Sequence, residues 1–485
     1  MESMPSRFNG APKWFSLAFV IVVLVIADSL RADSLGYAGG AAHTPTLDRL
    51  ASEGSQFRHA ISSAAWTVPS LVSMATGTFP HRIGVSRWRH PFPARRPTLM
   101  SAFAAAGFDV HSVVHNPRYC FANMGFRGTV SDSEDPDQVI RALSAPRGSD
   151  RLVIIHHWWT HLPYRNEPIP RKNWRALCSE IIDKLAQDPE SEVPLQRQRY
   201  ADAISWFDQQ LLSRYLDAAS SGGDDVVLAV TGDHGENWGD SLPPGRKMAH
   251  MYDLHGRWMT DETTRVPMLF WGKGTEGAVP AGRTLGGFAR GVDMAPTLAA
   301  LAGVPWPGPL PSEPGPTLVD RGIREVSDLE LDGISLASPL HRSVSSPVRD
   351  ALTVTSYNAI VPAKYPTSGK RMWRRFSLRT QDRRYTWDGQ DRYRAAIDID
   401  DDFEGVTAAG LARLSDGLKP LMATWGRFAR ERKSGLGPAP KLDPKLFPPF
   451  GAAAVRGIKW EDDDGGLGGD GEKLAKSMSM TGYMD

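Results

Sequence analysis

The chain has 485 residues, of which 41% are hydrophobic and 23% are charged, a composition typical of a folded globular protein. Its formal net charge of +1 gives the molecule as a whole no electrostatic preference for nucleic acid or for an anionic membrane. The 2 cysteines, Cys120 and Cys178, fit no metal-binding or redox spacing, so no disulfide framework is indicated and a reducing compartment is the default.

A continuous apolar run comes first, KWFSLAFVIVVLVIAD at residues 13–28. It is similar to the hydrophobic region of a signal peptide, but no small-residue cleavage site follows it and it is too short to span a bilayer as a helix. Because the run is rich in Val and Ile and ends abruptly at Asp28, we interpret it as a strand buried on both faces of a parallel sheet. We therefore expect no stable transmembrane anchor and favour a cytoplasmic location; a signal segment would instead indicate a secreted or periplasmic protein.

Strand-like and helical segments alternate after this run. We expect further strands at residues 109–116, 151–159, 225–232 and 264–272, and helices at residues 44–54, 98–107, 198–219 and 293–303. Alternation of this kind predicts an α/β fold with a largely parallel sheet sandwiched between helices.

The composition changes after residue 304 and divides the chain into four parts. We assign residues 1–304 to a large α/β domain that carries the candidate site, and residues 305–350 to a connecting loop rich in Pro and Gly. Residues 351–433 are expected to form a small C-terminal α+β subdomain that completes the fold, with antiparallel strands and one helix. The tail at residues 434–485 is rich in Gly, Pro and Asp, which predicts disorder.

Arginines alternate with aromatic residues between residues 370 and 394, as in KRMWRRFSLRTQDRRYTWD. A basic and aromatic surface is typical of nucleic-acid binding. Neither the net charge nor the rest of the sequence supports that function, so we interpret the segment as amphipathic strands with a solvated cationic face and expect no nucleic-acid partner. A milder alternative is that one or two of these arginines line a cleft and attract an anionic substrate.

The stretch SAAWTVPSLVSMATG at residues 63–77 predicts a short helix. Thr67 suits the N-cap, Pro69 suits the first turn and Gly77 suits a left-handed end, while Leu71 and Met74 give the helix a buried face. The hydroxyl of Thr67 has a second interpretation, as a nucleophile. The two interpretations are compatible, because a helix N-terminus offers a positive dipole and free N–H groups to an anion.

Two aspartates follow directly after predicted strands: Asp28 after the first, and Asp233, next to His234, in AVTGDHGE. The carboxyl ends of parallel strands share one edge of a sheet, where α/β proteins build their sites. Two carboxylates and an imidazole at that edge predict a site for a divalent metal ion. The alternatives are a turn at Asp233 and a helix cap at Asp28.

Six segments fall in the order of a known family's motifs. They are VIADSLRADSLGY, HTPTLDRLASEGSQFRHAISSAAWTVPSLVSMATGTFPHRIGV, VVHN with GFRG shortly after it, HHWWTHLPY, TGDHGE and HGRWMTDETTRVPML. Together they resemble the sulfatase-like branch of the alkaline phosphatase superfamily, over residues 19–303. The resemblance implies an alkaline phosphatase-like α/β fold and action on phosphate or sulfate esters through a covalent intermediate.

The resemblance also implies roles for individual residues. The nucleophile position falls on Thr67, and the metal-binding positions fall on Asp28, Asp233 and His234, with Thr67 itself as a further ligand. A divalent ion there would activate the hydroxyl and neutralise the ester oxygens. Oxygen and nitrogen ligands of this kind suit Mn²⁺, Zn²⁺, Mg²⁺ or Ca²⁺.

Three further positions are implied to bind substrate. His161, in THLPY, and His255 fall on two of them, and either could protonate the leaving group. Asn116 falls on the third. One metal ion is expected, and His255 with His250 could complete a site for a second. Weaker candidates are the other histidines of these motifs, His115, His156, His157 and His250.

The sequence departs from the sulfatase pattern at the nucleophile. Sulfatases resemble one another in C-x-P-x-R, whose cysteine or serine is oxidised to formylglycine, whereas this chain has Thr67, Val68, Pro69, Ser70 and Leu71. Threonine cannot give that aldehyde, because its Cβ carries a methyl group. The stretch resembles the threonine-nucleophile members, which include phosphodiesterases, phosphonate-ester hydrolases and phosphoethanolamine or phosphoglycerol transferases.

A second departure is Ser29, which stands where the family has another aspartate. We expect a metal-dependent hydrolase that acts on a small anionic ester, of the phosphate, phosphonate or sulfate type, through a covalent Thr67 intermediate, with phosphoesters favoured. One alternative is a transferase that passes the phosphoryl group to an alcohol. Another alternative is a catalytically inactive sulfatase-like binding protein, because Ser29 and Leu71 replace two residues of the family pattern. The sequence gives no prediction of the oligomeric state.

Overall fold

The first apolar run forms strand β1 (Val20–Ala27) in the interior of the main sheet, which confirms the strand interpretation of these residues. Val22 and Leu24 lie in the hydrophobic core on one face of the sheet, whereas Val23 and Val25 lie in the core on the other. Because both faces of β1 are covered, its sequence is continuously apolar rather than alternating.

The computed structural model describes the chain in segments. These are residues 19–80, 98–114, 129–132, 135–144, 148–166, 171–239, 254–256, 258–275, 279–306, 333–346, 351–357, 373–379, 383–388 and 393–398. None of the helices within these segments is long and apolar enough to cross a membrane.

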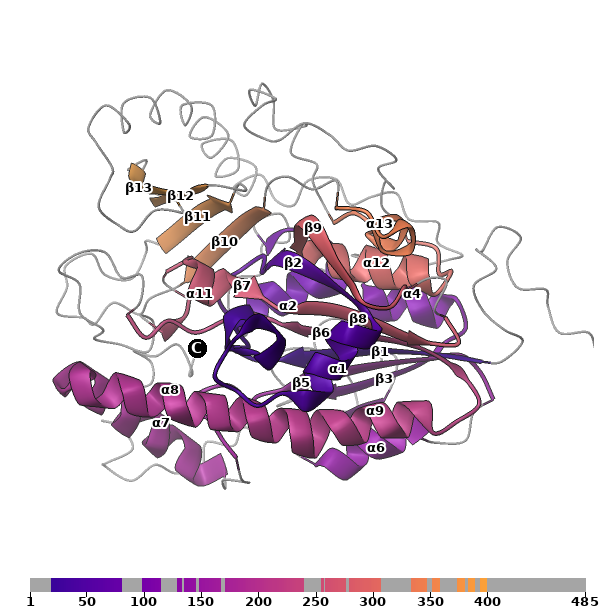
Figure 1. Cartoon of the computed structure of the whole chain (residues 1–485), viewed down its shortest axis with the longest axis horizontal. Coiled ribbons are helices and arrows are strands. Elements are labelled where there is room, and N and C mark those ends of the chain that lie inside the picture. The colour runs from indigo at the N-terminus through magenta and orange to yellow at the C-terminus, as the bar shows by residue number, and fades with distance from the viewer. Residues whose placement is uncertain are drawn as a thin grey trace, which may run out of the picture.

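The described residues form a main sheet of nine strands (Figure 1). Its order is β4 (Thr129–Asp132), β3 (Asp109–Val114), β5 (Arg151–His157), β1, β6 (Asp225–Gly232), β8 (Met268–Lys273), β2 (Ser55–Ile61) and β7 (Arg265–Val266), with β9 (Arg283–Arg290) paired to β2. The pairs from β4 to β6 and the β2–β9 pair are parallel, whereas β8 is antiparallel to β6 and β2, and β7 is antiparallel to β2. The predicted α/β fold with a largely parallel sheet is therefore confirmed.

Helices cover both faces of this sheet, as predicted (Figure 1). One face carries α2 (Thr67–Thr76), α4 (Leu99–Ala105), α12 (Met294–Leu301) and α13 (Ala337–Arg342). The other carries α1 (Pro45–Glu53), α6 (Pro136–Ser144), α7 (Arg171–Gln187), α8 (Pro189–Trp206) and α9 (Ser213–Ser220), with a π-helical segment, η4 (Phe207–Leu212), between α8 and α9. Short elements fill the turns: η1 (Ala32–Ser34), η2 (Gly36–Ala38), α11 (Asp261–Thr264) and η5 (Gly291–Asp293).

A second sheet follows, with four antiparallel strands in the order β10 (Ala351–Tyr357), β11 (Trp373–Arg379), β12 (Arg383–Asp388) and β13 (Tyr393–Asp398). It contacts the main unit through the Thr353 hydroxyl, which donates to the Ser62 carbonyl at 2.7 Å. Arg379, one of the arginines of the basic and aromatic stretch, is buried and pairs with Asp261 at 3.2 Å. Arg379 therefore serves the packing of this sheet rather than a solvated cationic face.

The connecting loop expected at residues 305–350 is partly helical. Helix α13 lies within it, because Leu336 and Leu340 are buried in the core beside α12. The helix expected in the C-terminal subdomain, around residues 411–431, and the tail at residues 434–485 lie outside the described residues.

Candidate active site

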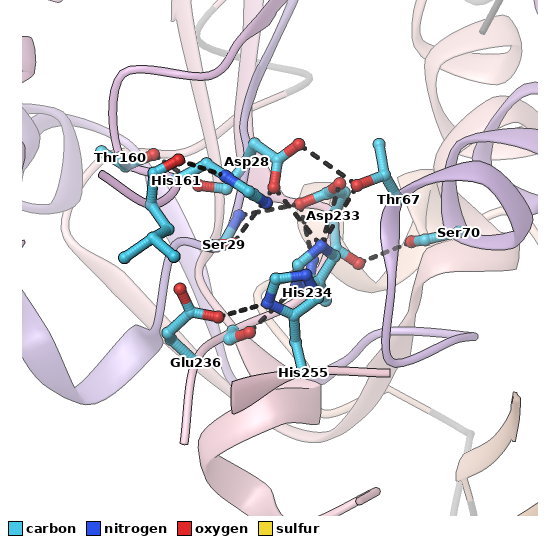
Figure 2. Close-up of polar contacts among 12 residues, drawn as sticks. Asp28, Ser29, Thr67, Ser70, Thr160, His161, Asp233, His234, Glu236 and His255 are labelled. Atoms are coloured by element: carbon cyan, nitrogen blue, oxygen red, sulfur yellow. Dashed lines mark hydrogen bonds and ion pairs between the residues drawn. The ribbon is translucent and has the colours of Figure 1, made fainter. Parts of the chain in front are cut away.

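The predicted metal ligands converge at the carboxyl ends of β1 and β6. Asp28, Asp233 and His234 are fully buried, and each places one ligand atom within 4.8 Å of those of the other two. The Thr67 hydroxyl lies 3.2 Å from Asp28 Oδ2 and 3.3 Å from His234 Nε2 (Figure 2). The structure therefore brings the candidate nucleophile and the three candidate ligands into one cluster.

The predicted N-cap role of Thr67 is wrong. The N-cap residue of helix α2 is Trp66, which is extended and makes no side-chain capping hydrogen bond, and Thr67 is the first helical residue. The hydroxyl points instead toward Asp28 and His234 (Figure 2). Gly77 does end the helix in the left-handed conformation, with φ of 62°, as predicted.

Helix α2 is tied directly to the loop that follows β6. Ser70, one turn after Thr67, donates to the carbonyl oxygen of Asp233 at 2.6 Å, and Ser62 donates to the same oxygen. These bonds fix the distance between the candidate nucleophile and the candidate ligand Asp233. The sequence offered no separate signal for these serines.

Ser29, which the sequence presented only as a missing aspartate, orients both carboxylates. Its amide donates to Asp233 Oδ1 at 3.0 Å and its hydroxyl donates to Asp28 Oδ1 at 3.1 Å (Figure 2). The backbone reaches this geometry with a φ of 62°, which is uncommon for a residue with a side chain. The Tyr200 hydroxyl supports the turn, because it donates to the Ser29 carbonyl at 2.6 Å and accepts from the Arg31 amide at 2.9 Å.

His156 also belongs to the cluster, although the sequence ranked it low. Its Nε2 lies 3.5 Å from Asp28 Oδ2 and 3.9 Å from Asp233 Oδ2. His156 pairs with Ile26 of β1 and so faces the side of the sheet that carries α2. His157 faces the other side, where its ring stacks on Tyr215 at 5.5 Å. Strand alternation could have separated the two histidines, but only with the position of α2 known.

The buried carboxylates perturb the pKa values around them. Burial lowers the pKa of His156, but the interactions with Asp233 and Asp28 outweigh it and raise this pKa to about 9. The pKa of His234 rises to about 10 for the same reasons. Burial raises the pKa of Asp28, but the neighbouring histidines, His161 first, hold it well below its ordinary value. The two buried carboxylates therefore favour positive charge beside them, which the protonated rings of His156 and His234 supply in the metal-free protein.

A bound divalent cation would also supply the positive charge that the two buried carboxylates favour. Asp233 Oδ2 is buried and accepts no hydrogen bond from any described residue, so it retains lone pairs for a ligand. Two carboxylates, an imidazole nitrogen and a hydroxyl form a donor set that suits a hard or borderline divalent ion. Asp28, Asp233, His234 and Thr67 are the residues that would hold it.

His161 and His255 lie beside this cluster with their ring centroids 5.1 Å apart (Figure 2). His161 Nδ1 donates to the Leu162 carbonyl at 2.7 Å, and His255 Nδ1 donates to Glu236 Oε1 at 2.5 Å. Burial lowers the pKa of His161 below its ordinary value. Burial raises the pKa of Glu236, but the interactions with His255, and then with His161 and His234, outweigh it and lower this pKa. Each ring is thus oriented through its Nδ1.

Two residues of the predicted site cannot be compared with the structure. Asn116 and His250 lie outside the described residues, as does His115. The substrate contact predicted for Asn116 and the second metal site predicted with His250 stay predictions. Glu236, which the sequence analysis did not single out, is a buried carboxylate that pairs with His255 beside the cluster.

A sequence model of the sulfatase family matches residues 21–304, more than half of the chain. The low-salt glycan biosynthesis sulfotransferase Agl7 of Haloferax volcanii is 28% identical over 290 residues, which are 59% of this chain and 61% of that protein. This chain therefore spans less than two thirds of that relative. Mouse iduronate 2-sulfatase is 22% identical over 405 residues, covering 60% of this chain and 70% of that protein.

Solved structures of the same kind share the fold. The phosphonate monoester hydrolase of Agrobacterium radiobacter superposes with a TM-score of 0.60 at 17% identity, over 84% of this chain and 96% of that chain. A 2-O GAG sulfatase superposes with a TM-score of 0.61 at 16% identity, over 89% of this chain and 96% of that chain. With the matched region spanning every described residue of the candidate site, the chain belongs to the sulfatase family.

Proposed function

We propose that this protein is a metal-dependent hydrolase that cleaves phosphate or phosphonate esters through a covalent ester on Thr67. The observation that carries the proposal is the position of the Thr67 hydroxyl, 3.2 Å from Asp28 Oδ2 and 3.3 Å from His234 Nε2. A nucleophile and the candidate ligands of a cation thus share one buried cluster at the N-terminus of α2.

A divalent ion bound by this cluster would lower the pKa of the Thr67 hydroxyl and neutralise the oxygens of the transferred group. The chain's own residues supply the rest. The N-terminal end of α2 presents its positive dipole to the anionic group. Thr67 Oγ1 loses its proton to solvent and forms a bond to phosphorus, the bond to the leaving oxygen breaks, and that oxygen takes a proton from a histidine beside the cluster. Water then attacks phosphorus and gives a proton back to this histidine, while the bond between phosphorus and Thr67 Oγ1 breaks and Oγ1 takes up a proton from solvent.

Phosphoesters are favoured over sulfate esters because of the chemistry of threonine. A formylglycine sulfatase releases sulfate when its hydrated aldehyde collapses, and a threonine ester has no such exit. Water must attack the phosphorus or the sulfur itself, and a phosphoryl group clamped by a divalent ion is the easier target. The arginine that would brace a hydrated aldehyde is replaced by Leu71, whose side chain is buried in the core and takes no part in the site.

A transferase is the second candidate function. The observation that favours it is the 28% identity to a protein described as a sulfotransferase in glycan biosynthesis. In such a reaction the alcohol of an acceptor would replace water in the second step. The two functions differ in the fate of the transferred group, so product analysis with and without an added alcohol separates them.

The test is a set of 4-nitrophenyl esters: the phosphate monoester, the phosphate diester, a phosphonate and the sulfate. Protein stripped with a chelator is assayed with Mn²⁺, Zn²⁺, Mg²⁺ and Ca²⁺ in turn, with and without glycerol as acceptor. We expect phosphate or phosphonate cleavage that depends on the metal, and a phosphate adduct on Thr67 by intact mass after rapid quenching.

The matched control is Ser73→Ala, which removes a buried hydroxyl of the same helix that donates to the Pro69 carbonyl at 2.7 Å. Thr67→Ala should lose activity by roughly three or more orders of magnitude, because nucleophilic catalysis is lost outright. Ser73→Ala should remain close to the wild-type rate. Equal activity of Thr67→Ala and wild type on every ester, or the sulfate as the best substrate, would overturn the proposal.

A further inference from the structure

We propose that Glu236 is a positioning residue that aims His255 at the leaving-group oxygen, and that His255 rather than His161 is the histidine that donates a proton to this oxygen. The inference rests on the proposed function and deepens it, because sequence reasoning left the two histidines equivalent. It is carried by the contacts of Glu236, a residue with no part in binding the cation.

Glu236 and His255 form a buried pair from two separate segments. His255 Nδ1 lies 2.5 Å from Glu236 Oε1, and both side chains are buried (Figure 2). Glu236 comes two residues after His234 at the end of β6, whereas His255 comes from a segment about twenty residues further along the chain. A pair formed between segments this far apart is a product of the tertiary structure and not of a local turn.

The backbone around His255 is fixed on both sides. The Asn237 amide donates to the Leu254 carbonyl at 2.7 Å, which joins this segment to the chain that carries Glu236. The Gly256 amide donates to the Ala65 carbonyl at 2.6 Å, which joins it to the loop just before Thr67. His255 is therefore held between its carboxylate partner and the candidate nucleophile, with its ring 4.7 Å from that of His234.

The carboxylate of Glu236 is itself locked. The Tyr164 hydroxyl donates to Glu236 Oε2 at 2.7 Å and accepts from the Trp238 indole at 3.2 Å. The bond at Oε2 thus fixes the orientation of the Glu236 carboxylate, and Oε1 accepts from His255. This arrangement permits one orientation of the His255 ring, with Nδ1 toward Glu236 and Nε2 toward the site.

His161 has a different partner. Its Nδ1 donates to the carbonyl of the next residue, Leu162, at 2.7 Å. The carboxylate whose charge acts most on His161 is Asp28, a candidate metal ligand, so a bound cation would offset that charge. Glu236 is not among the candidate ligands, so its carboxylate remains available to stabilise positive charge on the His255 ring and to strengthen the donor at Nε2. Of the two histidines, His255 is therefore the better donor to the negative charge that develops on a departing oxygen.

The test compares two esters of the same transferred group, one with a phenyl and one with a 4-nitrophenyl leaving group. Glu236→Gln keeps the size and an acceptor oxygen but removes the charge. We expect it to lower kcat/KM for the phenyl ester by about 100-fold and for the 4-nitrophenyl ester far less, because a good leaving group needs little help from an acid. His255→Asn should show the same pattern and His161→Asn should not.

Tyr164→Phe removes the hydrogen bond that locks the other carboxylate oxygen and should show the Glu236→Gln pattern in weaker form. Tyr215→Phe is the matched control, since it removes a buried hydroxyl on the other face of the sheet, and it should leave both esters close to the wild-type rate. Equal losses on the two esters for Glu236→Gln would overturn the proposal, as would the leaving-group pattern in His161→Asn.

A measurement that needs no turnover separates this proposal from the proposed function. Proton–nitrogen correlation NMR of histidine-labelled protein, assigned with His255→Asn, reports which ring nitrogens carry protons. We expect a protonated Nδ1 at His255 in wild type and a loss of that state in Glu236→Ala. An unprotonated Nδ1 in wild type would refute the positioning role. Absence of any ester cleavage, with the expected NMR result, would refute only the proposed function.

Discussion

Replacing Asp233 with asparagine isolates the charge of one candidate metal ligand. In Asp233→Asn the atom in the place of Oδ1 can still accept from the Ser29 and His234 amides, at 3.0 and 2.8 Å in the wild type. The atom in the place of Oδ2 becomes an NH₂ group aimed at His234 Nε2, 3.6 Å away. The substitution therefore keeps the shape of the loop and its backbone hydrogen bonds but replaces an acceptor with a donor.

The magnitude follows from the lost charge. At an effective dielectric constant of about 20, a unit charge pair about 4 Å apart is worth about 4 kcal/mol, and a divalent ion would lie closer to the carboxylate than that. A loss of about 4 kcal/mol weakens binding by roughly a thousandfold. We expect Asp233→Asn to lose nearly all bound metal at micromolar ion concentrations and to lose metal-dependent activity with it.

The assay is metal content by mass spectrometry after dialysis, together with the Kd from competition with a chelator. Asp208→Asn is the matched control, because Asp208 is also a buried aspartate but caps helix α1 by accepting from the Thr46 and Leu47 amides at 2.8 Å. This control should alter stability and leave metal affinity unchanged. Wild-type metal content in folded Asp233→Asn would refute the assignment of the site.

Three further predictions test the same cluster. Thr67→Ser should keep part of the activity that Thr67→Ala loses, because the hydroxyl remains while the β-methyl that restricts χ1 is gone; kcat and the phosphate adduct measure this. Ser29→Ala should weaken metal binding by about 10- to 100-fold with little loss of stability, because it removes only the hydroxyl that orients Asp28; unchanged affinity would contradict the orienting role. The metal-free protein should lose stability as the pH rises from about 6.5 toward 9, because the pKa of His156 is raised to about 9 in the folded state. The protonated ring stabilises the fold fully at pH values below its unfolded pKa of about 6.5, and this stabilisation is lost as the pH rises through the folded-state pKa. Denaturant unfolding at pH 6 and pH 9 measures this, and a flat profile would argue against the charge pairing with Asp28 and Asp233.

The sequence alone determined the class of fold and the general position of the site. A run as apolar as β1 can be satisfied only where both faces of a strand are covered, so the layered α/β arrangement follows from it. Asp28 and Asp233 directly follow β1 and β6, and these strands pair in parallel, so their ends lie at the same edge. Both inferences depend on the local hydrophobic pattern and on the direction of the strands, which can be read from the sequence.

The tertiary structure decided what depends on contacts between distant segments. The sequence could not tell which of the adjacent residues His156 and His157 faces the site, because that depends on the side of the sheet where α2 packs. It presented Ser29 as a missing ligand, although the turn after β1 makes it a donor to both carboxylates. It gave no sign of the bond between Glu236 and His255, because a hydrogen bond across separate segments leaves no periodicity and no fixed spacing in the chain.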